Sequence, residues 1–211
     1  MNKTVELVNT WAEFETRYPK GSIEDFCRHV LARQRSKTVK GKFVGGVIPP
    51  FNDGLLLKIV GRITKLNMFY AQKALEGTEI NQIEEFGVLA TISQDGNPRK
   101  TDVIYSSLLD LSSGSDMLNR LKKRGLIREY RDDHDKRSRR VELTVKGKRV
   151  MELCYERITR NVRMLMSDLN DDDKELCVHV LKEVEIKFSA LRANHKDMPF
   201  EKIYKEVMNM K

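Results

Sequence analysis

The chain has 211 residues, of which 40% are hydrophobic and 33% are charged, a balance typical of a soluble, helix-rich protein. No apolar run approaches the roughly 18 residues that cross a bilayer, and we expect neither a signal peptide nor a membrane partner. The three cysteines, Cys27, Cys154 and Cys177, exclude a disulfide framework, so the expected location is cytoplasmic, with reduced thiols.

The first fifty residues are predicted to be a helical extension followed by a linker. Apolar residues recur near helical spacing until Pro19-Lys20-Gly21 ends the first helix. Ser22 then opens a second helix as its N-cap, and Asp25, three residues later, resembles the partner in a capping box. The stretch 38–50 has glycines, two prolines and no stable period, so it is predicted to be the linker.

The rest of the chain reads mainly as helices, each recognised by its apolar period and by the residues that begin or end it. Thr101 and the acidic run 171–173 are expected to cap helices, and Gly125 is expected to end one. The predicted helices cover residues 53–75, 81–94, 101–109, 112–124, 146–169 and 174–192. The last fifteen residues are predicted to form a docked or frayed helix.

After Gly125 the apolar period changes from helical to extended. LIREY at 126–130 and RRVELTV at 139–145 are predicted to pair as a two-stranded hairpin with a long polar tip. Two short helices joined by a tight turn and followed by a hairpin are the layout of a winged helix-turn-helix. The predicted fold class is therefore mainly α with a small β-hairpin wing.

The positive charge is concentrated in one stretch. Residues 117–149 hold thirteen Lys and Arg against five Asp and Glu, a net +8 that equals the net charge of the whole chain. Such a concentration favours a phosphate-binding surface, although a charge run can also be a solvated face. We therefore expect double-stranded DNA as a partner.

The second short helix, 112–124, is the predicted recognition helix. Small polar side chains at its start can approach base edges or can simply cap the helix, and basic side chains near its end can reach flanking phosphates. The candidate DNA-binding residues are Ser112, Ser113, Ser115, Asp116, Asn119, Arg120 and Lys123. Lys122 and Arg124 are further candidates for phosphate contacts.

The segment LNRLKKRGLIREYRDDHDKRSRRVELTVKGKRV resembles the core signature of the multiple-antibiotic-resistance regulator (MarR) family of transcription factors. The matching positions are Leu121, Arg124-Gly125-Leu126-Ile127, Asp132, Asp135, Arg137, Leu143-Thr144 and Gly147. With the flanking helices, the resemblance covers about residues 51 to 192, and it leaves the first fifty residues outside.

The resemblance implies a homodimer whose first and last helices interlock, with two winged domains facing one pseudo-palindromic site. Wide apolar faces on the long helices favour the same assembly, since one small domain cannot bury them. These faces include Leu56, Ile63, Leu153, Ile158, Leu165, Val180, Val184, Phe188 and Leu191. Two-fold symmetry then places the half-sites roughly 34 Å apart.

We accordingly divide the chain by expected role. The extension and linker occupy 1–50, a helical dimerisation region 51–76 and 145–195, the winged DNA-binding domain 77–144, and a C-terminal tail 196–211. The resemblance further implies a repressor released by a small-molecule effector bound between the dimerisation helices and the DNA-binding lobe.

The charged tip is the predicted wing, 130–141. The resemblance implies that Arg137 reaches into the minor groove, where a narrow A·T-rich groove concentrates negative potential. Lys136 and Arg139 are the other residues of the wing that are predicted to contact DNA. Asp132 and Asp135 are hypothesised to pair with neighbouring arginines and to brace the loop.

Asp116 departs from the family pattern, in which this position is often basic or neutral. An acid here can accept a hydrogen bond from cytosine N4, or it can simply favour the helix N-terminus. The DNA sequence that the chain recognises is therefore left open.

Other chemistry finds no support in the sequence. The four histidines are scattered, and the spacings Cys27-Arg-His29 and Cys177-Val-His179 put the paired side chains on different helix faces, so no metal site is expected. Cys154 and Cys177 lie on apolar faces and are expected to be buried packing residues. No catalytic motif is present, so neither an enzyme nor a cofactor is expected. The alternative function is a winged-helix protein-interaction module, with residues 1–50 as its docking element.

Overall fold

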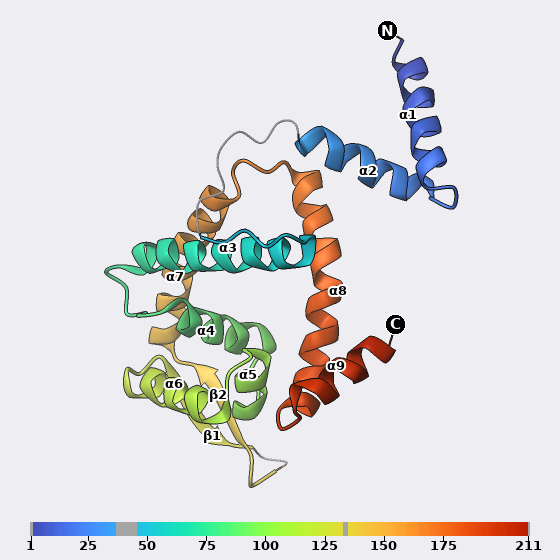
Figure 1. Ribbon diagram of the computed structural model, residues 1–211. Helices are drawn as coiled ribbons and strands as arrows, with labels where there is room; N and C mark the ends of the chain where they lie inside the picture. The colour runs from blue at the N-terminus through green and yellow to red at the C-terminus, as the bar shows by residue number, and fades with distance from the viewer. Residues whose placement is uncertain (1, 37–45, 133–134, 211) are drawn as a thin grey trace. The chain divides into compact units, whose positions relative to one another are not determined.

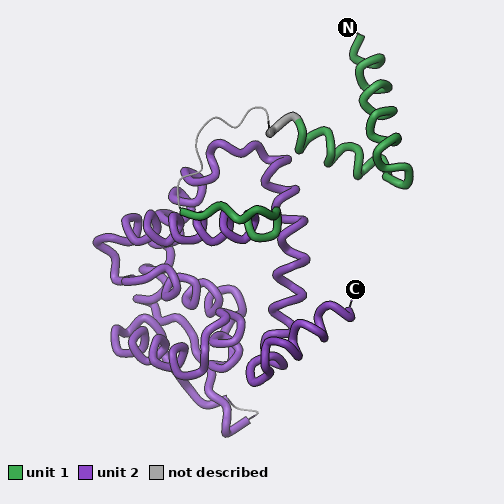
Figure 2. The backbone as a smooth tube through the Cα atoms, viewed as in Figure 1, with its two compact units in different colours: residues 1–55 green, residues 56–211 purple. Residues whose placement is uncertain are grey.

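The computed structural model describes residues 2–36, 46–132 and 135–210, in two compact units that comprise residues 1–55 and 56–211 (Figure 2). Most of the predicted linker and part of the wing tip lie outside the described residues. The bounds of the elements are α1 Lys3–Arg17, α2 Ile23–Ser36, α3 Asn52–Leu75, α4 Ile83–Asp95, α5 Lys100–Ser106, α6 Leu111–Lys123, β1 Ile127–Arg131, β2 Arg139–Leu143, α7 Val145–Leu165, α8 Asp171–His195 and α9 Phe200–Asn209 (Figure 1).

The first unit contains the hairpin of α1 and α2 and the start of α3. Phe14 and Phe26 are buried where α1 and α2 meet, and the ring of Trp11 contacts both. The predicted capping box is present, since the Ser22 amide donates to the Asp25 carboxylate at 2.9 Å and the Asp25 amide donates to Ser22 Oγ at 3.1 Å. The hydrogen bonds that the Ser22 amide and hydroxyl donate to the Asp25 carboxylate hold the pKa of that carboxyl below its usual value.

The core of the second unit lies in the lobe formed by α4, α5, α6, the hairpin and the adjoining ends of α3 and α7. Its buried side chains come from every one of these elements, so the lobe is a single packed body. The largest fully buried apolar side chains are Leu75, Leu89, Ile92, Ile104, Leu121, Leu126, Val88, Val103, Val141 and Cys154.

The wing is an antiparallel hairpin whose register runs from Ile127 opposite Leu143 to Arg131 opposite Arg139. A single bridge between Arg99 and Arg140 ties the turn before α5 to the outer edge of β2. The Val141 amide also donates to the Pro98 carbonyl at 3.0 Å. The wing is therefore anchored to the turn between α4 and α5 as well as to α6.

The structure corrects several predicted helix ends. Thr101 does not cap α5, because the helix begins one residue earlier and Thr101 Oγ1 donates to Asp102. The cap of α8 is Asn170, whose side chain accepts the Asp173 amide at 2.8 Å, so the acids 171–173 form the first turn instead. Helices α5 and α7 end at 106 and 165, a few residues before the predicted ends.

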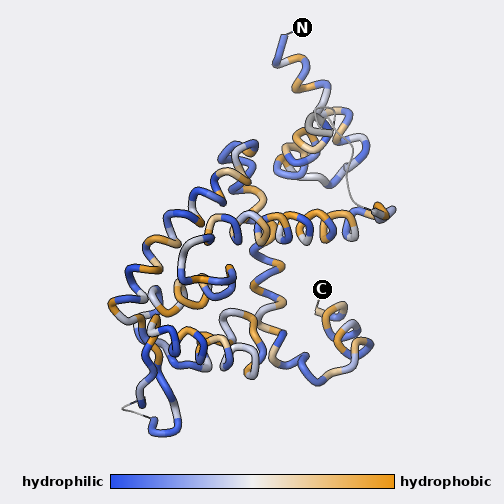
Figure 3. The backbone as a smooth tube through the Cα atoms, turned by 90° about the vertical axis from the view of Figure 1, so that its left-hand side faces the viewer, coloured by the Kyte–Doolittle hydropathy of each residue, from blue (hydrophilic) through white to orange (hydrophobic). Residues whose placement is uncertain are grey.

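The last two helices leave their apolar side chains largely uncovered in the single chain. Helix α8 has no buried residue, and hydrophobic residues recur along it and along α3 (Figure 3).

Cys177 is exposed, so the prediction that it is buried is wrong for this chain, whereas Cys154 is buried as expected. Burial raises the pKa of the Cys154 thiol. Ile158, predicted to lie on the uncovered face, packs against the core.

The described helices include none that is both long enough and apolar enough to cross a bilayer. The C-terminal residues form α9, as predicted for a helix at that position.

Gly147 allows the first turn of α7 to approach the start of β1. A Cβ atom at this position would lie 1.9 Å from the carbonyl oxygen of Leu126, which is backbone and cannot rotate away. Thr144 caps α7 there, accepting the Gly147 amide at 2.9 Å and donating to the Gly125 carbonyl at 2.6 Å. The helix and the hairpin therefore meet through backbone atoms.

We predict that Gly147→Ala destabilises the protein by about 3 kcal/mol, because the strand and the helix must separate to admit the methyl group. The matched control is Gly87→Ala in α4, where a Cβ atom meets nothing within 4 Å. The control should stabilise the helix by up to about 1 kcal/mol. Urea unfolding of the three proteins measures both effects, and equal stabilities would refute the close approach.

Candidate nucleic-acid interface

Helix α6 divides into a buried face and a solvent face. Gly114, Met117, Leu118 and Leu121 are buried against the lobe. The opposite face is exposed and carries the candidates Ser112, Ser113, Asp116, Asn119, Arg120 and Lys123, with Ser115 half-buried at its edge. A groove of about 660 Å³ runs along this face, lined by Asp116, Asn119, Arg120, Lys122 and Lys123. The structure thus brings the predicted recognition residues together on one accessible surface.

The crossing of α5 and α6 depends on Gly114. A Cβ atom there would lie 2.6 Å from Ile104 Cγ2, so the two helices touch at this point. The N-cap of α6 is Asp110, whose side chain makes no capping hydrogen bond. The simple alternative that the serines serve as the N-cap is therefore wrong, because the helix already begins at Leu111.

A buried carboxylate holds the C-terminal end of α6. Glu85 in α4 is 1% exposed, and its Oε1 lies 2.7 Å from Arg124 Nη2 and 4.0 Å from Arg120 Nε. Arg124 also donates to the Glu79 carbonyl at 2.6 Å. Arg124 was expected to contact a phosphate, but its guanidinium pairs with Glu85 within the lobe. Arg120 lies near the same carboxylate.

A second ion pair continues this network to α7. Lys146 Nζ lies 2.6 Å from the Glu79 carboxylate and donates to the Arg124 carbonyl at 3.0 Å. Sequence reasoning missed Glu85, although a signal was present. Glu85 shares a helical face with Val88, Leu89 and Ile92, and an acid at a core position indicates a buried partner.

Asp132 connects three segments at the base of the wing. Its side chain is fully buried, and Oδ2 lies 2.7 Å from Arg140 Nε on β2 and 3.5 Å from Arg99 Nε before α5. Arg140 also donates to the Asn97 carbonyl at 2.8 Å. The expected pairing of Asp132 with an arginine is present, while the roles of Arg99 and Arg140 escaped the sequence analysis.

Asp135 acts differently from the pairing expected for it. Its Oδ1 accepts the Arg137 amide at 3.0 Å, and its carbonyl accepts the Ser138 amide at 2.8 Å. Because these are bonds to backbone amides, the acid shapes the turn without an arginine side chain. Lys136, Arg137 and Arg139 are exposed beside it.

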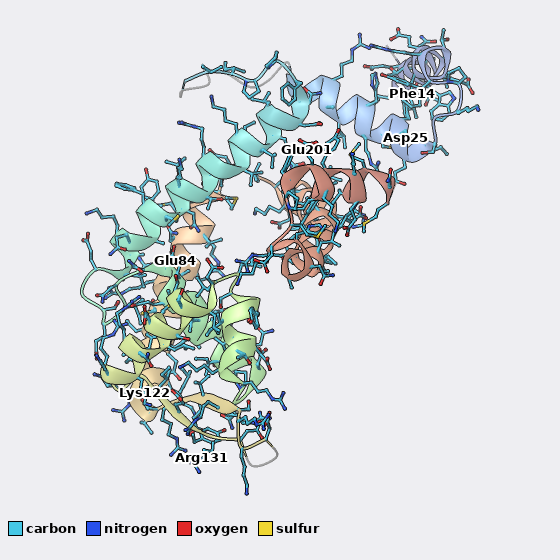
Figure 4. The ribbon with its side chains drawn as sticks, turned by 60° about the horizontal axis from the view of Figure 1, so that its bottom comes forward. Phe14, Asp25, Glu84, Lys122, Arg131 and Glu201 are labelled. Carbon is cyan, nitrogen blue, oxygen red and sulfur yellow. The ribbon has the colours of Figure 1, made fainter. Side chains whose placement is uncertain are left out.

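Lys122 and Arg131 mark the two parts of the candidate interface, α6 and the wing, which lie at the same end of the lobe (Figure 4). Glu129 on β1 lies 3.6 Å from Lys122 and 3.8 Å from Lys100, which offsets part of the positive charge there. Among the described residues, no cluster of three or more His, Cys, Asp or Glu side chains could hold a metal ion. The arrangement is suited to contact with a polyanion.

We predict that Asp132→Asn destabilises the protein by about 2 kcal/mol, since the arginines lose a buried anion while remaining partly exposed themselves. Asp135→Asn is the matched control, because an amide oxygen can still accept the Arg137 amide. Thermal unfolding should show the first variant clearly less stable and the second nearly unchanged. Similar losses of stability in both variants would refute the role of Asp132 as the buried partner of Arg99 and Arg140.

No protein-family model and no curated protein sequence matches the chain. Solved structures do match it in fold. A mutant MarR from E. coli complexed with operator DNA has a TM-score of 0.59 at 22% identity, covering 64% of this chain and 98% of the other.

Two further structures match similarly. The PcaV transcriptional regulator from Streptomyces coelicolor, in complex with its natural ligand, has a TM-score of 0.57 at 19% identity, covering 68% of this chain and 97% of its own. BpsR of Bordetella bronchiseptica, whose DNA binding is regulated by 6-hydroxynicotinic acid, has a TM-score of 0.57 at 20% identity, covering 62% and 98%. The chain therefore has the winged helix-turn-helix fold of the MarR-family transcriptional regulators, as its sequence signature predicted.

Proposed function

We propose that the chain is a homodimeric transcriptional regulator that binds a pseudo-palindromic operator through residues 112–124 and the wing 130–141. In this proposal it acts as a repressor, and the binding of a ligand releases it from the operator. The observation that carries this proposal is the coincidence of charge and geometry. The stretch 117–149, whose net charge equals the +8 of the whole chain, runs through the second half of α6, the two strands of the wing and the first turn of α7, and it places exposed cations on α6 and on the wing.

The two surfaces are suited to different tasks. The start of α6 offers short polar side chains, Ser112 and Ser113, which allow a helix to approach base edges in a major groove. The wing offers exposed Arg137 and Arg139 on a braced turn, which suits insertion into a minor groove. The E. coli MarR structure with operator DNA supports this use of the fold.

Homodimerisation is proposed from the uncovered apolar stripe of α8. Val180, Val184 and Phe188 are spaced four residues apart and are 48, 52 and 47% exposed. Leu56 and Ile63 on α3 are exposed to a similar degree. A soluble protein rarely leaves such a stripe in water, and a second copy would cover it by two-fold symmetry.

We predict that the wild-type chain binds a non-specific duplex with a steep salt dependence, and that Arg137→Ala lowers the log–log slope by about 1 because one counterion fewer is released. The Arg137 amide bond to Asp135 does not require its side chain, so the turn should persist. Lys20→Ala, which removes one exposed charge outside the second unit, is the control and should leave the slope unchanged.

Fluorescence anisotropy at rising salt measures these slopes. A wild-type slope near zero would exclude the DNA-binding function and favour the protein-interaction module. If Arg137→Ala has the same slope as wild type, only the role proposed for Arg137 in the wing is refuted.

We predict that the wild-type chain is a dimer at micromolar concentration and that Val184→Glu shifts it to monomer, because a charge cannot be buried unpaired in an apolar interface. Lys182→Glu is the control, since it adds an acid to another face of the same helix. Sedimentation equilibrium distinguishes the species. A dimeric Val184→Glu variant would show that the stripe is not the interface.

A further inference from the structure

Helices α1 and α2 meet in a small aromatic cluster. Phe14 lies at its centre, with ring centroids 5.2 to 5.8 Å from those of Trp11, Tyr18 and Phe26. A Cβ atom at Gly21 would lie 2.7 Å from the Phe14 ring, so the turn between the helices closes directly against this ring. The cluster and the turn therefore hold α1 and α2 together as one two-helix unit.

This unit has little core of its own. Phe14 and Phe26 are the only buried residues among the described side chains of α1 and α2. Units of fewer than about 40 residues usually need a disulfide, a metal ion or association with another chain. Cys27 is the only cysteine in residues 1–36, and the described part of the chain holds no cluster of potential metal ligands. Association is the stabilising route that remains.

An apolar face runs along both helices beside the aromatic cluster. Ala12 and Cys27 each follow a residue of the cluster by one position. Because the chain doubles back between the helices, this step of about 100° leads to the same side of the unit in both. The exposed residues that recur there every three or four positions, called the N-terminal face below, are Val5, Val8, Ala12, Ile23, Cys27 and Leu31.

The charge of the unit favours a protein partner over a nucleic acid. Helix α1 has two basic and three acidic residues, and α2 has three basic and two acidic residues, so the two formal charges are −1 and +1. Arg33 lies 3.4 Å from Glu13, and Arg28 pairs with Glu24. In a two-fold symmetric contact, α1 of each copy can lie against the oppositely charged α2 of the other.

We propose that the N-terminal face binds the same face of a second copy, so that α1 and α2 of two chains form a four-helix bundle. The pairing rests on the proposed homodimer, which supplies the second copy. Fifteen residues, 37–51, separate α2 from α3 and reach at most about 50 Å. Two such segments span far more than the roughly 34 Å between half-sites, so the two units of one dimer can meet. Their contact is then intramolecular, which raises their effective concentration.

Sedimentation equilibrium of the full-length protein tests the pairing. Val8→Glu and Ile23→Glu, one on each helix, should each weaken self-association at least about tenfold, because the contact would bury an unpaired charge. Val8 and Ile23 are 60 and 72% exposed in the single chain, so both variants should fold, which circular dichroism checks. Ala32→Glu adds an acid to another side of α2 and is the matched control, with an unchanged dissociation constant.

Trp11 reports on the N-terminal face directly, because it is the only tryptophan of the chain and adjoins Ala12. Its side chain is half-buried in the single chain. Acrylamide should quench its fluorescence less in the wild-type dimer than in Val8→Glu. Dilution of wild type below its dissociation constant should abolish this difference.

The proposal is overturned if both variants associate as tightly as wild type, or if Trp11 is equally accessible in the variants and in the wild-type dimer. It is also overturned if Trp11 stays protected in monomeric wild type, because the face would then be covered by its own chain. A dimer that Val184→Glu dissociates, but that the two N-terminal variants leave unchanged, would refute this pairing alone. A dimer that responds only to Val8→Glu and Ile23→Glu would refute the α8 interface and retain the pairing.

Discussion

The orientation of α6 depends on the buried carboxylate of Glu85. An isolated charge in this position would be strongly unfavourable, so the acid requires the guanidinium of Arg124 at the end of α6. Arg124 in turn binds the Glu79 carbonyl, and Glu79 binds Lys146 at the start of α7. A shift of α6 along its axis would break several of these bonds at once. The bonds therefore fix the C-terminal end of α6, which is the end away from Gly114.

Glycines and acids share the positioning of the interface. At Gly114 and Gly147 the missing side chain lets a helix contact Ile104 and the Leu126 carbonyl directly. At Glu85 and Asp132 a buried anion draws basic side chains inward from different segments. The glycines let neighbouring elements approach closely, and the buried anions connect separate segments through ion pairs. The exposed cations therefore lie on elements that share one packed core, which suits a surface that would contact a regular polyanion.

The sequence predicted the elements well because their signals are local. Apolar periods, the capping box at Ser22 and the glycine after α6 depend on neighbours within one turn of helix. The pairing of charges was not predictable in this way. Arg124 sits among phosphate-binding candidates in sequence, but its partner Glu85 lies 39 positions earlier, and only the fold brings them together. The exposure of Cys177 was missed for a related reason, because an apolar helix face does not reveal whether its own chain covers it.

The internal pairs also refine the charge of the candidate interface. Within 117–149, Arg124, Arg140 and Lys146 have carboxylate partners that belong to the lobe, so they contribute little to the outer field. Within the part of the chain that the structure describes, Lys123, Lys136, Arg137 and Arg139 form no ion pair. These four lie on the exposed face of α6 and in the wing. Asp132 therefore does more than dilute the positive charge of the tip, because it pairs with the inner Arg140 while the outer Arg137 and Arg139 face solvent.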